Sequence, residues 1–195
     1  ACLVGSEMCI RDSAYEAQNQ PDKALDTVQA GVMVDDTNPT LYALGGKLAL
    51  SEDNVKLAET YLQKALAIDP EDQGNMLAWS NFLVQEERDQ ENVDFLDQID
   101  RSGDVDPQIY WNMAKSYDRL ENIKKARENY LLAFNRFQDS PDFLHDIIDF
   151  FQSTGARAEL KAALVRYLKL VPTDDEMQAR LDELNAELSL IHISE

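Results

Sequence analysis

Residues 39–72 read PTLYALGGKLALSEDNVKLAETYLQKALAIDPED, and this order of large, small and aromatic residues returns along the chain every 34 residues. Prolines mark the period. Pro39, Pro107 and Pro141 are separated by 68 and 34 residues, and Pro70 and Pro172 by 102. The period predicts a partial repeat at 14–38, followed by four full repeats at 39–72, 73–106, 107–140 and 141–174.

Each repeat carries the pattern of two helices. Apolar residues recur at spacings of three, four and seven, which places them on one helix face. Polar breaks rich in Asp, Asn and Pro fall near positions 14–16 and 32–34 of the repeat. Asn38, Asp106 and Ser140 stand directly before prolines and are expected to cap helices. The sequence therefore predicts an all-α chain of antiparallel helix pairs.

Small residues recur at positions 8, 20 and 27 of the best-formed repeats, and we expect the paired helices to come closest there. They are Gly46, Ala58, Ala65, Ala114 and Ala126. A side chain larger than Ala at such a crossing costs about 1–3 kcal/mol of overpacking. We expect these residues to lie between helices, since one pair cannot bury its apolar face alone and stacking must supply the core.

The combination resembles the tetratricopeptide repeat (TPR). Repeat 39–72 matches with Tyr42, Gly46, Ala58, Leu62, Ala65 and Pro70, and repeat 107–140 with Tyr110, Ala114, Tyr117, Ala126, Tyr130 and Ala133. The other two repeats depart from the pattern at Asn92, Ile99, Asp104, Ile148, Leu160 and Tyr167. The resemblance implies a right-handed α-solenoid over 14–174, with 175–187 as a capping helix or the start of another repeat. Its overall texture is similar to cytoplasmic TPR proteins of bacteria.

The two ends look foreign to the repeats. Residues 5–13 and 188–195 can be encoded by complementary strands of one DNA segment, which resembles the transposon-end adapter of sequencing libraries. Residues 1–13 and 188–195 are therefore predicted to be adapter-derived, and 14–187 to be a fragment of a natural protein. That fragment has no cysteine, one histidine, and 17 basic against 34 acidic residues.

Composition excludes several classes of function. The whole chain has 37 acidic and 18 basic residues, a net charge of −19, which argues against nucleic-acid binding. No apolar run is long enough to span a membrane. No glycine-rich phosphate loop, nucleophile elbow or Ser/His/Asp set occurs, so we expect no enzyme activity and no cofactor.

The resemblance implies that the first helix of each repeat lines a concave groove. The candidate peptide-binding residues on that face are Lys47, Leu77, Asn81, Trp111, Lys115, Arg119, His145 and Asp149. Trp111 is the expected aromatic anchor, because Tyr110 and Trp111 are adjacent on one helix and cannot both point into the core. The alternative is that Trp111 packs against the next repeat. Trp79 is expected in the core.

Charge is uneven between repeats. Repeat 73–106 has a net charge of −7 and repeat 107–140 a net charge of +2, so an acidic peptide or C-terminus near Lys115 and Arg119 is one hypothesis. The alternative is a solvated helix face with pairs such as Glu121–Lys125. His145 and Asp149 have the i,i+4 spacing of two metal ligands on one helix face. Because the natural fragment has a single histidine and no cysteine, no metal site is predicted.

These observations predict a non-catalytic scaffold or adaptor that holds a protein or peptide partner in its groove. Three other functions stay open: a peptide-sensing regulator, the regulatory array of a larger enzyme, and a self-assembling structural array. The identity of the partner and the oligomeric state are not encoded in any motif.

Overall fold

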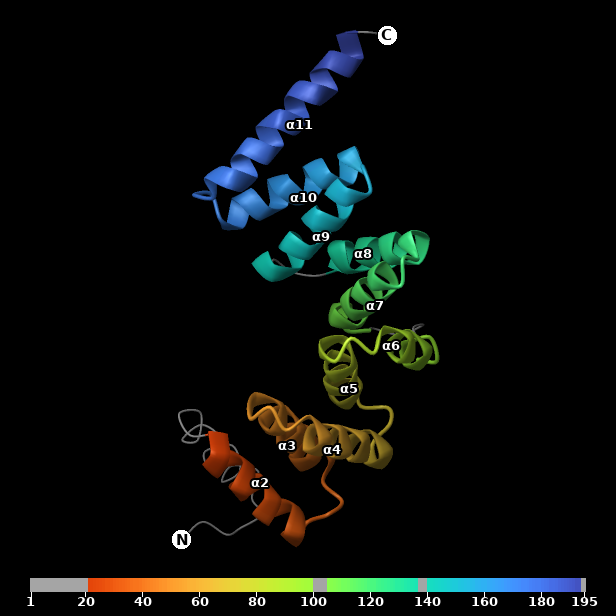
Figure 1. The fold of residues 1–195 in the computed structure, drawn as a ribbon, viewed down its shortest axis with the longest axis vertical. Helices are drawn as coiled ribbons and strands as arrows, with labels where there is room; N and C mark the ends of the chain where they lie inside the picture. Colours follow the sequence, from red (N-terminus) through yellow and green to blue (C-terminus); the bar gives the residue numbers. More distant parts are fainter. Residues whose placement is uncertain (1–20, 100–104, 137–139, 194–195) are drawn as a thin grey trace. The chain divides into compact units, whose positions relative to one another are not determined.

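The computed structural model describes residues 21–99, 105–136 and 140–193, and all regular secondary structure in these ranges is helical. The chain divides into two compact units, residues 1–109 and residues 110–195, which we describe separately. The expected all-α fold is confirmed (Figure 1).

The helices follow one another as antiparallel pairs joined by short turns (Figure 1). The first unit contains α2 (Pro21–Val34), α3 (Pro39–Ser51), α4 (Val55–Ile68), α5 (Gln73–Gln85) and α6 (Asp89–Leu96), and the first turn of α7 (Pro107–Arg119). The second unit contains the rest of α7 with α8 (Ile123–Arg136), α9 (Pro141–Ser153), α10 (Arg157–Leu170) and α11 (Asp175–Ile193).

The structure describes part of one of the two segments predicted to be adapter-derived, 188–195, and none of the other, 1–13. Residues 1–13 lie outside the part of the chain that the structure describes. The backbone of residues 188–193 continues helix α11 without a break. The adapter origin of both ends stays a prediction.

Helix starts follow the expected caps. The Asn38 side chain accepts a hydrogen bond from the backbone N–H of Thr40 at 3.1 Å. Asp106 and Ser140 accept from N–H groups of their own first turns, at 2.8 and 3.4 Å. All three caps are confirmed, and each satisfies a donor that the helix itself leaves unpaired.

The turn inside each helix pair has one recurring conformation. Its fifteenth repeat position lies in the left-handed region, with φ of 58° at Asp53, 56° at Glu87, 57° at Glu121 and 68° at Gly155. The following backbone N–H donates to a carbonyl five residues earlier at 2.8–2.9 Å in all four turns. This is the Schellman closure of a helix C-terminus, and it reverses the chain into the second helix.

The small residues of the repeats are buried, as the sequence predicts. Ala58, Ala65, Ala114 and Ala126 are fully buried, and Gly46 is buried as well. A Cβ added at Gly46 would lie 2.5 Å from Cγ of Leu62 on the paired helix. The predicted close approach of the two helices is therefore confirmed.

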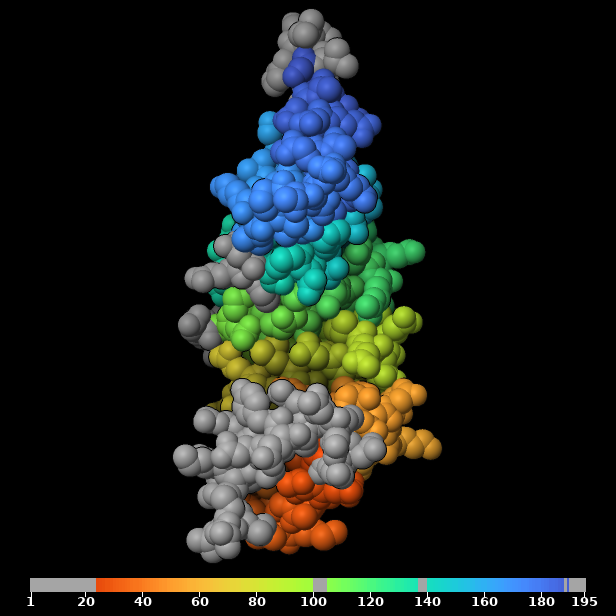
Figure 2. All heavy atoms as spheres, turned by 90° about the vertical axis from the view of Figure 1, so that its left-hand side faces the viewer, coloured from red at the N-terminus to blue at the C-terminus, as the bar shows by residue number. Residues whose placement is uncertain are grey.

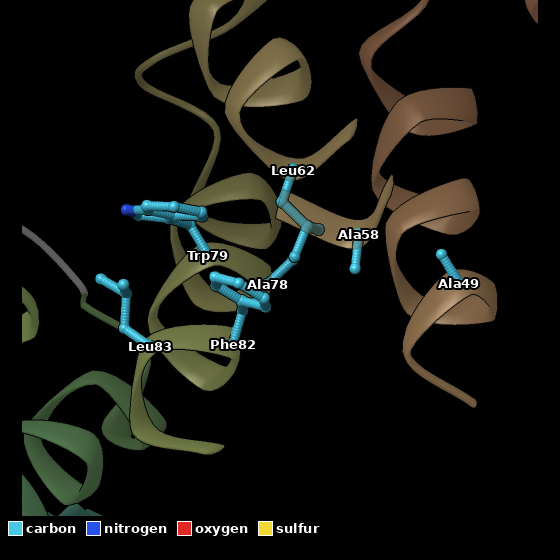
Figure 3. Packing of buried hydrophobic residues seen from close by; sticks show 7 residues of the cluster. All are labelled: Ala49, Ala58, Leu62, Ala78, Trp79, Phe82 and Leu83. Atoms are coloured by element: carbon cyan, nitrogen blue, oxygen red, sulfur yellow. The ribbon is translucent and has the colours of Figure 1, made fainter. Parts of the chain in front are cut away.

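A packed apolar cluster joins α3, α4 and α5 (Figure 3). Ala58 of α4 faces Ala49 of α3, and Leu62 lies beside Ala78 and Phe82 of α5. Trp79 stacks on Phe82 with ring centroids 5.1 Å apart and is 5 % exposed, so its expected core position is confirmed.

Helix α6 departs from its counterparts. It has eight residues, whereas α4, α8 and α10 each have 14. No side chain caps its start, although Asp89 and Glu91 in its first turn favour the helix dipole, and no basic residue stands in its last turn. A cavity of about 540 Å³ lies at this end of the pair, lined in part by Phe95, Ile99 and Ile109.

The second unit runs from α7 to α11, and its atoms form successive bands in the order of the sequence (Figure 2). Its core includes Phe143, Ile147 and Phe151 of α9, all fully buried. Met177 and Leu184 bury the inner face of α11, which packs against α10. Residues 175–187, predicted as a capping helix or the start of another repeat, lie within α11.

Candidate functional site

An open cavity of about 390 Å³ lies on the second unit, where α7 and α9 run past each other. The charged groups of its wall come from the first helices of two successive repeats, and its inner part from buried aromatic rings. The lining includes Lys115, Asp118, Arg119, Tyr130, Asp146 and Asp149. Three of the predicted groove residues, Lys115, Arg119 and Asp149, are thus brought together.

Trp111 stands beside this cavity. Two positions were considered for it from the sequence: an aromatic anchor in the groove, and packing against the next repeat. It is half-buried, its Nε1 donates to the Asp146 carboxylate at 2.9 Å, and its ring meets Phe143 edge-on at 5.4 Å. The Lys115 ammonium lies 4.4 Å from the indole centroid, a cation–π contact. Trp111 therefore packs against the next repeat while its ring supports a lysine of the cavity.

Asp149 and His145 point to different neighbours. The Asp149 carboxylate accepts a hydrogen bond from Arg180 of α11 at 3.2 Å. His145 is exposed, and its ring meets Tyr167 of α10 edge-on at 5.1 Å. Within residues 21–99, 105–136 and 140–193, no group of three or more His, Cys, Asp or Glu side chains has the geometry to hold a metal ion.

Burial shifts the pKa of two groups that line the cavity, the Lys115 ammonium and the Asp118 carboxyl. It lowers the pKa of the Lys115 ammonium, while the nearby Asp146 partly restores it. It raises the pKa of the Asp118 carboxyl, with Asp146 adding to the rise and Arg119 opposing it. Both changes follow from the cost of keeping a charge where water is partly excluded.

Tyr130 forms part of the inner wall. Burial raises the pKa of its hydroxyl, and the carboxylates of Asp146, Asp118 and Asp149 raise it further, whereas Arg119 lowers it. The phenol is therefore neutral at physiological pH. Its ring packs against Phe150 with centroids 4.7 Å apart.

The remaining predicted residues belong to the first unit. Lys47 of α3 and Asn81 of α5 are exposed, and Leu77 of α5 is half-buried. Their role in binding stays a prediction.

The charge of the cavity bears on the hypothesis of an acidic peptide. Asp118, Asp146 and Asp149 share the lining with Lys115 and Arg119, and Arg180 of α11 pairs with Asp149 at 3.2 Å. Carboxylates and cations are therefore equal in number here, so the local charge does not favour an acidic segment.

Sequence reasoning did not assign Tyr130, Asp146 or Arg180 to this site. Tyr130 stands at a core position of the repeat, and only its place at the edge of the packing exposes it to the cavity. A charged residue at Asp146, one position after the predicted groove residue His145, was the available signal.

None of the helices in the described ranges is long and apolar enough to cross a membrane.

Comparisons with known proteins agree on the repeat. The profile described as "YpiA-like, C-terminal tetratricopeptide repeats" matches residues 107–174, and the profile described as "Tetratricopeptide repeat" matches residues 39–72. Among curated proteins, the TPR repeat-containing protein YpiA of Bacillus subtilis (strain 168) is 26% identical over 179 residues, which are 90% of this chain. The chain spans 42% of the length of that relative.

Solved structures share the fold. TTC0263, a thermophilic TPR protein of Thermus thermophilus, matches with a TM-score of 0.69 at 17% identity, over 93% of this chain and 100% of its own. PilW, a type IV pilus biogenesis factor, matches with a TM-score of 0.74 at 13% identity, over 94% and 90% of the two chains. YrrB, described as a TPR protein with an unusual peptide-binding site, matches with 0.64 at 13% identity, over 91% and 92%.

Proposed function

The chain carries tetratricopeptide repeats, and from this premise we propose that it is a non-catalytic scaffold that binds a segment of a protein partner. The segment, a peptide or a helix, lies on the face formed by the first helices of the repeats. In the second unit this face contains the cavity beside Lys115, Arg119 and Asp149.

The cavity is the observation that carries the proposal. It is open to solvent, holds both signs of charge, and has aromatic rings, Tyr130 and Phe150, in its lining. Binding surfaces for peptides combine an aromatic contact with a few polar groups that fix orientation. Helices pack behind these groups, so little ordering entropy is lost on the scaffold side.

The likeness to YrrB supports this kind of function, because that protein has a peptide-binding site on the same fold. A cytoplasmic location, implied by the resemblance to bacterial TPR proteins, stays part of the proposal.

A blocking substitution tests where peptides bind. Ser153 is exposed at the cavity, and its hydroxyl donates to the backbone carbonyl of Phe150 at 2.9 Å. Ser51 stands at the same position of the repeat in the first unit, is also exposed, and donates to the carbonyl of Leu48 at 2.7 Å. Ser153→Trp therefore fills the cavity, and Ser51→Trp is its matched control.

The measurement uses the full chain and a random peptide library. We expect peptides enriched on the wild-type protein to bind Ser153→Trp at least about tenfold more weakly, a loss of roughly 1.4 kcal/mol, and to bind Ser51→Trp normally. Equal binding to Ser153→Trp, or no enrichment on the wild-type protein, would show that the cavity is not the binding site.

A further inference from the structure

The early end of helix α6 leaves apolar side chains of the first unit uncovered. Helices α4, α6, α8 and α10 all begin at the seventeenth position of their repeats, but α6 ends at Leu96 and the others continue for six more residues. Six helical residues measure about 9 Å, which is nearly two turns. The cavity of about 540 Å³ lies where α6 ends, and Phe95 of its last turn lines it.

Met76 of α5 shows what the short helix uncovers. It stands at position 4 of its repeat, where the other three full repeats carry buried residues, Tyr42, Tyr110 and Leu144. Met76 is only half-buried and lines the cavity. Ile99, at position 27, is half-buried as well, whereas the residues at that position in the other full repeats are buried. The cavity therefore leaves open two positions that the other repeats pack into their core.

The lining of this cavity is mainly apolar. Of the nine described residues that line it, six are apolar: Pro70, Met76, Phe95, Ile99, Val105 and Ile109. Gln73 closes one edge, since its side-chain oxygen accepts a hydrogen bond from the backbone N–H of Asp106 at 3.0 Å. All these residues belong to the first unit, so the cavity is separate from the one beside Lys115.

The protein around the cavity carries an excess of negative charge. Residues 69–99 and 105–109 contain ten acidic residues and one basic residue, Arg88. Arg88 is already matched, because its guanidinium pairs with Glu59 at 2.6 Å and with Glu91 at 2.7 Å. The balance thus differs from that of the cavity in the second unit, where cations and carboxylates are equal in number.

Exposed carboxylates stand close to the lining. Glu71 lines the cavity, and Asp69, Asp94 and Asp97 are sequence neighbours of lining residues; all four are exposed. No Lys or Arg occurs among residues 69–76 or 89–99. Such a surface attracts cationic segments and repels anionic ones.

We propose that this cavity receives the apolar face of a short basic helix of a partner protein. Leu- or Phe-sized side chains of that helix contact Met76, Phe95 and Ile99, in the space that a longer α6 would cover, and its Lys or Arg residues face Glu71. Helices bound in grooves use apolar side chains at i, i+3, i+4 and i+7 spacing as anchors. A second copy of this chain suits the site poorly, because two chains of net charge −19 repel each other. The inference does not depend on the function proposed above.

The test uses the full chain and fluorescent model peptides built from Leu, Ala and Lys. The probe peptide has Leu at i, i+3, i+4 and i+7 spacing, which gives it one apolar helix face. One comparison peptide has the same composition in scrambled order, and the other has Glu in place of Lys. Fluorescence anisotropy measures the dissociation constant of each.

Two pairs of variants locate the binding site. Gln98 is exposed in the lining and donates to the backbone carbonyl of Asp94 at 2.8 Å, so Gln98→Trp fills the cavity. Gln90→Trp is its matched control, since Gln90 is exposed outside the lining and donates to the Asp94 carboxylate at 2.8 Å. Glu71→Lys and Glu128→Lys change the net charge equally at exposed positions, but only Glu71 lines the cavity.

We expect the probe to bind the wild-type chain at least about tenfold more tightly than either comparison peptide. Gln98→Trp should weaken probe binding at least about tenfold and Glu71→Lys several-fold, whereas Gln90→Trp, Glu128→Lys and Ser153→Trp leave it unchanged. Equal binding of the probe and the scrambled peptide, or equal effects within either pair of variants, would overturn the inference. Weakening by Ser153→Trp alone would assign the probe to the cavity of the second unit, which overturns this inference and leaves the proposed function intact.

Discussion

At the scale of single residues, two consecutive glycines in α3 show what the helix crossing demands. Glycine inside a helix costs about 1 kcal/mol relative to alanine. A Cβ at Gly45 would lie 2.5 Å from the Tyr61 ring, and one at Gly46 would lie 2.5 Å from Cγ of Leu62. Both glycines therefore permit a contact that any other residue would prevent.

Gly46→Ala is expected to destabilise the protein. Leu62 is buried in the cluster of α3, α4 and α5, so it cannot swing aside to admit the methyl group. Overpacking of about 1–3 kcal/mol should outweigh the gain in helix propensity. The measurement is the urea midpoint of the circular dichroism signal.

Gly31→Ala is the control for this substitution. Gly31 also lies inside a helix, α2, but its added Cβ would approach Leu41 only to 3.4 Å, an ordinary contact. Here the helix propensity should act alone and stabilise by about 0.5–1 kcal/mol. A stable Gly46→Ala protein would mean that the helices separate easily and that the small residue is not required.

At the scale of the helix pair, the left-handed turn residue is a recurrent source of strain. Glu121 adopts φ of 57° and Gly155 adopts φ of 68° at equivalent positions. The left-handed conformation costs a residue with a Cβ about 1–2 kcal/mol, and glycine avoids this cost. Nothing lies within 4 Å of a Cβ built on Gly155, so backbone conformation alone decides the effect there.

Glu121→Gly is expected to stabilise the protein by about 0.5–1 kcal/mol, and Gly155→Ala to destabilise it by about 1 kcal/mol. Glu121→Ala serves as the control, since it removes the same side chain but keeps the strain and should change little. Thermal unfolding of the three variants separates the two contributions. Equal stabilisation by Glu121→Gly and Glu121→Ala would assign the effect to the glutamate charge instead.

The sequence predicted helix pairs well and turn conformations poorly. Apolar spacing and caps such as Asn38 depend on local pattern, which a sequence displays. Glutamate at two of the four left-handed positions gives no sign of a positive φ, because the geometry is imposed by the helices on either side. The short α6 was foreseeable only as a departure of its repeat at Asn92 and Ile99, without its extent.

The candidate site could also be predicted only in part, because the sequence displays local pattern but not the geometry between helices. The groove face was implied by the TPR resemblance, and the cavity does join Lys115, Arg119 and Asp149. Its inner wall depends on how far Tyr130 reaches past its neighbours, which periodicity does not encode. The double role of Trp111, on Phe143 and under Lys115, also depends on the distance between two helices.

At the scale of the whole molecule, charge is distributed unequally. Residues 1–109 contain 22 acidic and 7 basic residues, whereas residues 110–195 contain 15 and 11. Such an excess of one sign destabilises a folded chain through self-repulsion. Ion pairs such as Arg88–Glu59, at 2.6 Å, oppose it only locally.

Added sodium chloride is therefore expected to raise the melting temperature. At about 0.1 M salt the screening length falls to about 10 Å, which weakens repulsion between exposed carboxylates. A relief of about 1 kcal/mol corresponds to an increase of about 2–4 °C for a chain of this size. Differential scanning calorimetry at low and moderate salt is the measurement. A fall in melting temperature would mean that attractive ion pairs outweigh the net charge.

The chain has two tryptophans, and the fold gives them different surroundings. Trp79 is enclosed by the apolar cluster of the first unit, whereas Trp111 borders the cavity of the second unit, with an ammonium group over its ring. Indole fluorescence depends on local polarity and on nearby charge. The protein consequently contains one intrinsic optical reporter for the integrity of its first unit and another for occupancy of the cavity, and each can be isolated by replacing the other with phenylalanine.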